Sequence, residues 1–326
     1  MSGRVLITGG AGFIGSHLVE RLCRDGRAVV VLDDLSTGRR ENLTGLEQEG
    51  CRFEFVEGSI TDAATVARAM QGVDGVIHLA ALPSVARSVE RPLDSHLACA
   101  TGTITVLDAA RRNRARVVYA GSSSAYGNQQ AEYKQEDLRE DPLSPYAAAK
   151  LGGELYCRAF ARVYGLPVVV TRFFNVFGPR QPADSPYSGV VAAFCRALLR
   201  GEAPRIDGDG GQSRDFTYVG DVTAGVVRCL DAGTEGCVTI NLAYGQATTV
   251  QDLYTQLAAF AGEVRDLPAP RPPQHAPPRT GDVRHSLADT ARAREVFGIV
   301  PEIGFREGLR RTFDWYRTTF GRSITQ

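Results

Sequence analysis

Three glycines, Gly9, Gly12 and Gly15, stand between a short apolar run and a helical pattern at the start of the chain. The run, Arg4–Thr8, is typical of a buried parallel strand. Glycines at the end of such a strand allow a tight turn and let backbone N–H groups approach a phosphate at the N-terminus of the next helix. The pattern therefore predicts a strand, a phosphate-binding turn and a helix, the first unit of a doubly wound α/β sheet.

The second apolar run, 28–32, ends in two carboxylates, Asp33 and Asp34. A carboxylate about 20 residues beyond such glycines typically binds the adenosine ribose hydroxyls of a dinucleotide. Two adjacent negative charges would repel a 2′-phosphate, so the pair favours NAD over NADP. A glycine turn used only for packing would not account for Asp33, and the combined features indicate dinucleotide binding.

Strand-like and helical stretches alternate as far as Thr171. Apolar runs recur at 53–56, 76–79, 117–120 and 166–171, and helical patterns separate most of them, notably at 94–112 and 146–164. The alternation predicts an α/β fold with a Rossmann-like, doubly wound parallel sheet. Beyond Asn175 the sequence is irregular, with helical patterns at 190–200, 219–231 and 305–316, a strand pattern at 238–242 and a proline-rich stretch at 267–278 that predicts an extended surface loop.

This division predicts two domains. We expect residues 1–175 to form an NAD-binding Rossmann domain, to which approximately residues 219–245 return. Residues 176–326 are expected to form a smaller, irregular substrate-binding domain. It should cover the carboxyl edge of the sheet, where α/β proteins hold their ligands.

Composition narrows the classes of partner. Lys plus Arg and Asp plus Glu both number 37, so no net charge recruits nucleic acid or an acidic membrane surface. No apolar run approaches the length of a membrane span. The seven cysteines are dispersed and odd in number, without a CxxC pair. They indicate reduced thiols in a cytoplasmic protein, with neither a disulfide framework nor a metal site.

The segment Ser144-Pro145-Tyr146 begins a second functional pattern, with Lys150 four residues after the tyrosine. Ser144 suits a helix N-cap and Pro145 the first helical position, so Tyr146 and Lys150 should share one helix face. A neighbouring ammonium is expected to lower the pKa of the phenol, which makes the tyrosine a usable general base. A surface helix with an exposed Tyr and Lys is the plain alternative, and it is the commoner one for such a short motif.

Three serines, Ser122, Ser123 and Ser124, follow the apolar run at 117–120. The carboxyl end of a buried strand is where α/β sheets hold ligands, and a hydroxyl can both donate and accept a proton. The cluster could serve as a serine-rich turn, but its position ahead of the Tyr146 helix favours a proton relay between substrate and tyrosine.

Taken together, the motifs resemble those of the extended short-chain dehydrogenase/reductases, and more narrowly the NAD-dependent nucleotide-sugar epimerases and dehydratases. The resemblance rests on Gly9-x-x-Gly12-x-x-Gly15, Ser122–Gly127, Ser144-Pro-Tyr146-x-x-x-Lys150, Arg172–Asn175, Gly211–Phe216 and Arg279–Val283. These six motifs occur in order along essentially the whole chain. The family expectation is therefore a specific one.

The resemblance implies a role for each matched residue. Tyr146 is the general base for the C4 hydroxyl of the sugar, Lys150 holds the nicotinamide ribose, and Ser122 is the catalytic hydroxyl residue. The implied NAD contacts are Gly9, Gly12, Phe13, Ile14, Gly15, Asp33, Asp34, Ser36, Thr37, Gly38, Ser59, Ile60, Leu79, Ala80, Ala81, Cys99, Tyr146 and Lys150. The implied contacts to the nucleotide sugar are Arg87, Ser122, Ser123, Ser124, Asn175, Gly189, Val190, Arg214, Arg279 and Asp282.

Within the resemblance, the residues after Ser122 bear on the reaction. Dehydratases and decarboxylating relatives place ionisable residues there, whereas this chain has Ser123, Ser124 and Ala125. The implied activity is 4-epimerisation of a UDP-sugar through transient oxidation at C4, rotation of the 4-keto sugar and hydride return. A nucleotide-sugar oxidoreductase or lyase (a 4,6-dehydratase or UDP-glucuronate decarboxylase) and a non-catalytic NAD-binding module remain as alternatives.

The sugar and the assembly stay open at this point. Ser286 stands where some hexose epimerases carry a large tyrosine, and with Arg87, Ser123 and Ser124 it leaves glucose, N-acetylhexosamine and uronic acid derivatives as candidates. The helical stretches 94–112 and 146–164 carry apolar stripes that pair across a two-fold axis in relatives. The resemblance thus implies a homodimer, although the stripes could be buried within one subunit.

Overall fold

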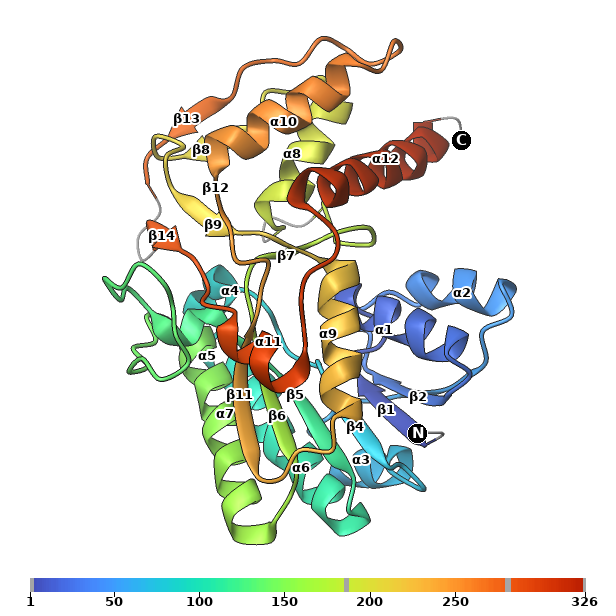
Figure 1. Cartoon of the computed structure of the whole chain (residues 1–326). Coiled ribbons are helices and arrows are strands. Elements are labelled where there is room, and N and C mark those ends of the chain that lie inside the picture. The colour runs from blue at the N-terminus through green and yellow to red at the C-terminus, as the bar shows by residue number, and fades with distance from the viewer. Residues whose placement is uncertain (1–2, 185–187, 279–282, 325–326) are drawn as a thin grey trace.

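The central sheet of the computed structural model, which describes residues 3–184, 188–278 and 283–324, has seven parallel strands (Figure 1). In spatial order they are β11 (Cys237–Leu242), β6 (Val168–Phe173), β5 (Arg116–Ser122), β4 (Gly75–His78), β1 (Arg4–Thr8), β2 (Ala28–Asp33) and β3 (Phe53–Glu57). The direction of winding reverses between β1 and β4, which creates the crevice where doubly wound sheets bind ligands. The predicted α/β, Rossmann-like architecture is confirmed.

Apolar side chains on both faces of the sheet place helices in two layers. Along β1, Val5 and Ile7 join one buried cluster and Leu6 joins the other, as the alternation of a strand requires. The first cluster is covered by α1 (Phe13–Arg24), α2 (Glu41–Gln48), α9 (Val219–Asp231) and α11 (Ala291–Phe297). The second is covered by α3 (Ala63–Ala69), α6 (Gly102–Asn113) and α7 (Pro145–Tyr164). The second helix layer includes the predicted Tyr146 helix, α7.

Helix α7 is terminated by clear local signals at both ends. The Ser144 hydroxyl accepts a hydrogen bond from the Ala147 N–H at 3.1 Å, and Pro145 takes the first helical position. Gly165 ends the helix with φ +65°, a conformation that favours glycine. These caps fix the register in which Tyr146 and Lys150 occur on the helix.

The helix predicted at 94–112 is interrupted. Helix α4 (Val85–Glu90) is followed by α5 (Pro92–His96), a π-helical turn η1 (Leu97–Thr101) and then α6. Within this stretch the Thr103 hydroxyl donates to Cys99 O and the Thr105 hydroxyl donates to Thr101 O. Such side-chain bonds to the backbone compete with regular helical pairing, and the hydrophobic period of the sequence does not register them.

The C-terminal region has its own core above the carboxyl ends of the sheet (Figure 1). Its helices are α8 (Val190–Leu199), α10 (Val250–Gly262) and α12 (Phe305–Ile324), and aromatic residues such as Phe194, Phe260 and Phe313 fill the space between them. The remaining described strands form three small sheets. One sheet contains β12 (Ala247–Thr249), β9 (Ser213–Asp215) and β14 (His285–Ser286). The other two are the pairs β8 (Arg205–Asp207) with β13 (Gln274–Ala276), and β7 (Val176–Phe177) with β10 (Thr217–Tyr218).

Two features of this region differ from, or add to, the sequence-based expectation. The proline-rich stretch 267–278 is not wholly a loop, because its end forms β13 and pairs with β8. Helix α9 and strand β11 return to the large sheet, where β11 pairs with β6 along its whole length. Among the helices of the described ranges, none has the length and apolar character needed to cross a membrane.

Candidate active site

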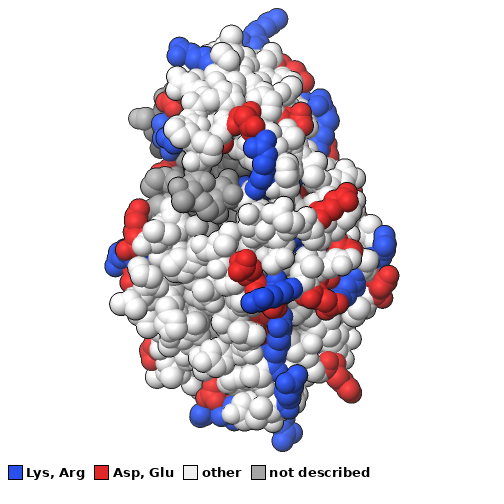
Figure 2. Space-filling view, turned by 90° about the vertical axis from the view of Figure 1, so that its left-hand side faces the viewer, with Lys and Arg blue, Asp and Glu red and all other residues white. Residues whose placement is uncertain are grey.

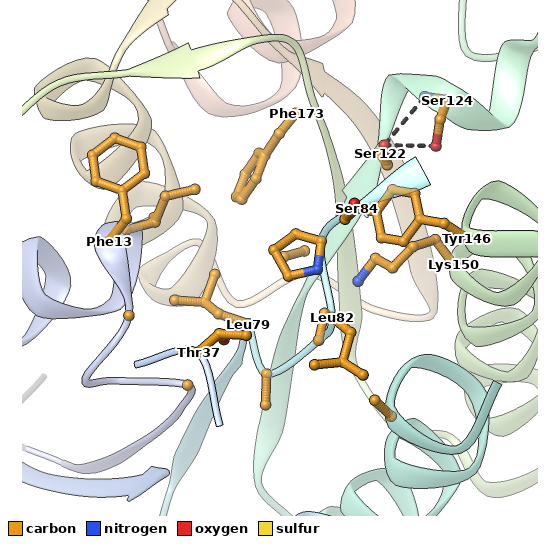
Figure 3. Close-up of a pocket in the computed structure, with 18 of the residues that line it drawn as sticks. Phe13, Thr37, Leu79, Leu82, Ser84, Ser122, Ser124, Tyr146, Lys150 and Phe173 are labelled. Atoms are coloured by element: carbon orange, nitrogen blue, oxygen red, sulfur yellow. Dashed lines mark hydrogen bonds between the residues drawn. The ribbon is translucent and has the colours of Figure 1, made fainter. Parts of the chain in front are cut away.

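A cavity of about 1100 Å³ runs along the carboxyl edge of the sheet, between the sheet and the C-terminal region. Its wall includes residues that follow β1, β4 and β5, so the cavity spans the point where the winding reverses. Figure 3 shows Phe13 and Thr37 on one side of this space and Tyr146 and Lys150, from α7, projecting into it from the other.

The glycine turn after β1 is shaped by its backbone. Gly9 has φ +73°, and a Cβ added to Gly15 would lie 2.1 Å from Gly9 O. Gly12 is the N-cap of α1 and supplies no side chain to cap the helix. The N–H groups of the first helical turn therefore lack a side-chain partner where Gly12, Phe13 and Ile14 border the cavity, and this arrangement suits a diphosphate.

Asp33 is held at the end of β2 by the backbone around it. One carboxylate oxygen accepts the Ala11 N–H at 2.9 Å and the other accepts the Leu35 N–H at 2.9 Å. Burial raises the pKa of this carboxyl group. Because each carboxylate oxygen can accept more than one hydrogen bond, Asp33 retains capacity for ribose hydroxyls on the cavity side. The turn and the carboxylate together fit a dinucleotide cofactor.

The predicted catalytic residues converge at the opposite end. Ser122 ends β5, and the short 3₁₀ turn η2 (Ser123–Tyr126) follows it. The Ser122 hydroxyl accepts hydrogen bonds from the Ser124 N–H at 3.2 Å and the Ser124 hydroxyl at 2.8 Å (Figure 3). The Lys150 ammonium lies 4.4 Å from the centroid of the Tyr119 ring, and the Tyr119 hydroxyl donates to Lys150 O at 2.9 Å. Both contacts hold the lysine against β5.

The electrostatics of Tyr146 differ from the expectation. Burial raises the pKa of the Tyr146 phenol, and hydrogen bonding with Ser122 acts in the opposite direction. Burial also lowers the pKa of Lys150. The expected lowering by Lys150 is therefore wrong as the dominant effect, because enclosure of the phenol penalises the phenolate more than its neighbours stabilise it. Among the described residues, Ser122 favours the ionised tyrosine through its hydrogen bond.

A buried ion pair fixes α7 against the sheet. Arg172 in β6 is fully buried and contacts the buried Glu154, with Nε 3.1 Å from Oε2 and an Nη 2.6 Å from Oε1. Glu154 lies one helical turn after Lys150. The Arg172 guanidinium also lies 4.6 Å from the centroid of the Tyr126 ring in η2. One side chain thus connects the helix of Tyr146 with the turn that follows Ser122.

The wall on the side of the C-terminal region offers a second place for phosphate groups. Gly189 is the N-cap of α8 and, like Gly12, has no side chain to cap its helix. Asn175, at φ +29°, follows β6, and Arg214 comes from β9. All three border the cavity together with Arg87 from α4. An open helix N-terminus with arginines nearby suits an anionic ligand.

Most residues implied by the resemblance border the cavity. They are Gly9, Gly12, Phe13, Ile14, Gly15, Asp33, Asp34, Ser36, Thr37, Gly38, Ser59, Ile60, Leu79, Ala80, Ala81, Arg87, Ser122, Ser123, Ser124, Tyr146, Lys150, Asn175, Gly189 and Arg214. Cys99 does not border it, because its side chain is buried within η1. The side chain of Val190 packs on the C-terminal core instead. Arg279 and Asp282 lie outside the described residues.

The cavity wall also contains residues that the sequence did not single out as site residues. They include Leu82, Ser84, Lys134, Phe173 and Gln181. Phe173 lies inside the motif Arg172–Asn175 and could have been inferred from it. Ser84 is the N-cap of α4 and accepts the Arg87 N–H at 3.1 Å. No local sequence signal marks Lys134 as a site residue, because it occurs in a polar loop.

Comparisons with known proteins agree with this geometry. Residues 5–243 match the NAD dependent epimerase/dehydratase family. A UDP-glucose 4-epimerase of Mycolicibacterium smegmatis is 41% identical over 317 residues, covering 96% of this chain and 98% of that protein. A crystal structure of UDP-glucose 4-epimerase with UDP-glucose from Thermotoga maritima is 36% identical, with a TM-score of 0.90 and coverage of 97% and 99%. A dTDP-glucose 4,6-dehydratase of Mycobacterium tuberculosis is 32% identical, over 96% of this chain and 93% of that protein.

Proposed function

The chain belongs to the NAD-dependent epimerase/dehydratase family, and we propose that it is a UDP-sugar 4-epimerase with NAD as its cofactor. One observation carries the proposal: a single cavity joins two helix N-termini without side-chain caps, those of α1 and α8, and Tyr146, Lys150 and Ser122 border the same space. Two diphosphate-containing ligands could bind from opposite sides with their reactive ends at Tyr146.

The two walls would hold the two ligands. The turn Gly9–Gly15 and Asp33 would bind the diphosphate and adenosine ribose of NAD, and Lys150 its nicotinamide ribose. When bound, NAD supplies the acceptor for a hydride from C4 of the sugar and the donor for its return. Asn175, Gly189 and Arg214 would bind the nucleotide diphosphate, and we extend this role to Arg279, whereas Asp282 would lie near the uridine-side ribose. The proposal assigns NAD to the region 1–175 with 219–245, and the nucleotide sugar to 176–326.

Proton transfer would fall to the protein. Tyr146 would take the proton of the C4 hydroxyl as the sugar is oxidised and return it when the sugar is reduced. Ser122 would hydrogen-bond the same oxygen and stabilise the phenolate, a role supported by its effect on the Tyr146 pKa. Lys150 would orient rather than transfer protons, because its ammonium is held over the Tyr119 ring.

The residues around Ser122 favour epimerisation over elimination. A dehydratase must remove a proton beside the keto group and protonate a leaving hydroxyl, which needs a further acid/base pair. Ser123 and Ser124 have no ionisable carboxyl group, and burial raises the pKa of Tyr126 to about 12. A protein that carries out only hydride transfer in both directions needs Tyr146 and a hydroxyl partner.

The test uses protein purified without added cofactor. UDP-glucose, UDP-N-acetylglucosamine and UDP-glucuronic acid are supplied separately, with and without NAD, and NMR resolves the C4 epimers. We expect a mixture of epimers without net consumption of NAD. A 4-keto or pentose product, or stoichiometric reduction of NAD, would instead assign an oxidoreductase or lyase. NAD binding with no turnover of any UDP-sugar or other nucleotide sugar would support a non-catalytic module.

We further propose a homodimer through α4, α5 and α7. Leu93 is 75% exposed, Leu97 50% and Leu155 51%, and helices α4 and α5 both contact α7. Figure 2, which faces this side of the molecule, shows few charged side chains in the area to the left of its centre. Large exposed apolar residues that gather on adjacent helices favour association. Light scattering should give twice the chain mass, and Leu93→Asp with Leu155→Asp should give the single mass.

A further inference from the structure

The chain has 37 lysine and arginine residues, and only two of these, Lys134 and Lys150, are lysines. Both are buried, at 2% and 4% exposure, and both border the cavity. The other 35 of these residues are arginines, and both lysines border the same cavity. Lys150 has a role in the proposed reaction. Lys134 does not yet have one.

The backbone of Lys134 is fixed next to the reaction centre. It lies in the segment between η2 and α7, where its N–H donates to Leu287 O at 2.8 Å and its carbonyl accepts the Asp289 N–H at 3.1 Å. The same carbonyl accepts the Asn241 amide at 2.6 Å, and Asn241 accepts the Tyr126 hydroxyl at 2.6 Å. Lys134 is thus two hydrogen bonds from η2, the turn that follows Ser122.

The ammonium of Lys134 has neutral partners in the protein. It donates to Gln129 O and to Ala131 O, the latter at 3.2 Å. An ammonium has three N–H donors, so these two bonds leave one. Within the described part of the chain no carboxylate forms an ion pair with Lys134. The nearest buried acid in sequence, Glu136, accepts the Asn241 N–H at 2.7 Å and lies 3.8 Å from Arg292.

A buried cation with only neutral partners is costly, and a bound anion offsets the cost. Burial lowers the pKa of Lys134, which reflects that cost. The cavity wall on this side is made of hydroxyl groups, from Ser122, Ser123, Ser124 and Ser286. The carboxylates of the described wall, Asp33, Asp34, Asp94 and Asp184, come from other segments.

We propose that Lys134 recognises a carboxylate on the sugar, so that the enzyme takes a uronic acid type of UDP-sugar. The inference rests on the proposed function and adds the chemical class of the sugar. A diphosphate would be the other anion in such a cavity. In the proposed function the open N-terminus of α8 and Arg214 bind that group. The backbone of Lys134 is instead linked through Asn241 to the turn that follows Ser122.

Two lysines in the whole chain make a direct binding test possible. Protein labelled with ¹³C at the lysine ε-carbon and loaded with NAD should give two main side-chain signals, and the Lys134→Arg variant identifies the one from Lys134. We expect UDP-glucuronic acid to shift the Lys134 signal, and UDP-glucose and UDP to leave it nearly unmoved. Equal shifts with UDP alone would overturn the carboxylate assignment in favour of the diphosphate.

The kinetic test compares substrates. In Lys134→Met, kcat/KM for UDP-glucuronic acid relative to UDP-glucose should fall about 10–100-fold, the usual range for a lost charge-assisted hydrogen bond. Lys134→Arg should recover part of the ratio. Arg139→Met removes an exposed cation from the same segment and should leave the ratio within about 2-fold. If Lys134 had only a structural role, its loss would lower kcat/KM for both substrates equally and leave their ratio unchanged. Equal losses on both substrates would therefore refute the proposal.

The two proposals fail separately. A wild-type enzyme that epimerises UDP-glucose but neither binds nor converts UDP-glucuronic acid would contradict the role of Lys134 and leave the epimerase assignment intact. A protein that binds UDP-glucuronic acid through Lys134 without epimerising any UDP-sugar would support the carboxylate site and contradict the epimerase assignment.

Discussion

The two ends of the cavity are built in different ways. At the cofactor end, the glycine turn and Asp33 come from one strand–helix–strand unit, and the shape of the turn depends on the close backbone approach of Gly15 to Gly9. The other end is assembled from η2, α7, β6 and β9, and side chains such as Arg172 join them. A ligand shared by many proteins can be held by a local backbone motif, whereas discrimination between sugars depends on residues distant in sequence.

Removal of the Arg172 side chain should destabilise the end of the cavity that is assembled from η2, α7, β6 and β9. In Arg172→Met, Glu154 loses its buried partner, and the free energy of unfolding should fall by about 3–5 kcal/mol. Arg158→Met is the matched control, because Arg158 pairs with the same Glu154 but is 37% exposed, and its loss should be below about 1 kcal/mol. Denaturant unfolding followed by circular dichroism measures both. Similar losses in the two variants would show that burial of Arg172 is unimportant.

Tyr146→Phe should separate chemistry from cofactor binding. Loss of the hydroxyl removes the proposed base while the cofactor end stays intact, so turnover should fall by about 10²-fold or more. The NAD content of the purified variant should match that of the wild type, as measured by absorbance after denaturation. Tyr156→Phe changes an exposed tyrosine on the same helix and should keep full turnover. Near wild-type turnover in Tyr146→Phe would contradict the proposed base.

Gly15→Ala should break the cofactor end. Its Cβ would lie 2.1 Å from a backbone oxygen, so the turn must move, at a cost of about 1–3 kcal/mol in stability and with weaker NAD binding. Gly45→Ala in α2 is the control, because beyond the neighbouring backbone of its own helix nothing lies within 4 Å of the added Cβ, and it should stabilise by about 0.5–1 kcal/mol. Thermal unfolding and NAD titration distinguish the two variants. Unchanged NAD affinity in Gly15→Ala would show that the turn does not set the cofactor site.

The free energy of unfolding should depend on pH through a contact between the Rossmann-like region and the C-terminal region. His17 in α1 hydrogen-bonds Pro179 O at 2.9 Å, and burial, followed by the Arg180 charge, lowers its pKa to about 4. The unfolded chain then binds a proton near pH 6.5 and the native state only near pH 4. The stabilisation by neutral His17 is therefore complete above pH 6.5 and is lost as the pH falls towards 4.

The stability lost through His17 at pH 5, relative to its value above pH 6.5, should be about 2 kcal/mol. His17→Gln keeps a donor for Pro179 O but does not titrate, so its unfolding free energy should decline less steeply between pH 6.5 and 4. His78, whose pKa burial lowers to about 3, gives a decline of the same sign in both proteins. Identical slopes for the wild type and His17→Gln would rule out His17 as a source.

The sequence predicted the elements that local signals determine. Helix α9 was predicted at its observed bounds, 219–231, because its apolar period is regular, and α7 followed from Ser144 and Pro145. The π-helical turn was missed, and so were the bonds from the Thr103 and Thr105 hydroxyls to backbone carbonyls in the same stretch. These contacts leave no trace in the hydrophobic pattern.

The candidate site divides in the same way. The glycine turn and Asp33 could be predicted because spacing along one strand–helix–strand unit fixes them. Lys134 could not, since its place depends on backbone bonds to Leu287 and Asp289, which are distant in sequence. The raised pKa of Tyr146 could not be predicted from the sequence either. A motif gives the neighbouring lysine, but only the fold gives the extent of enclosure.

The return of α9 and β11 to the large sheet has a consequence for synthesis of the protein. The apolar cluster beneath β1 includes Val226, Ile240 and Phe297 together with Val5 and Ile7. A nascent chain that has left the ribosome only as far as β6 therefore exposes the face of the sheet that α9 and α11 later cover. The N-terminal half therefore cannot bury this face until the C-terminal residues have been synthesised, and in that interval the exposed apolar surface favours aggregation.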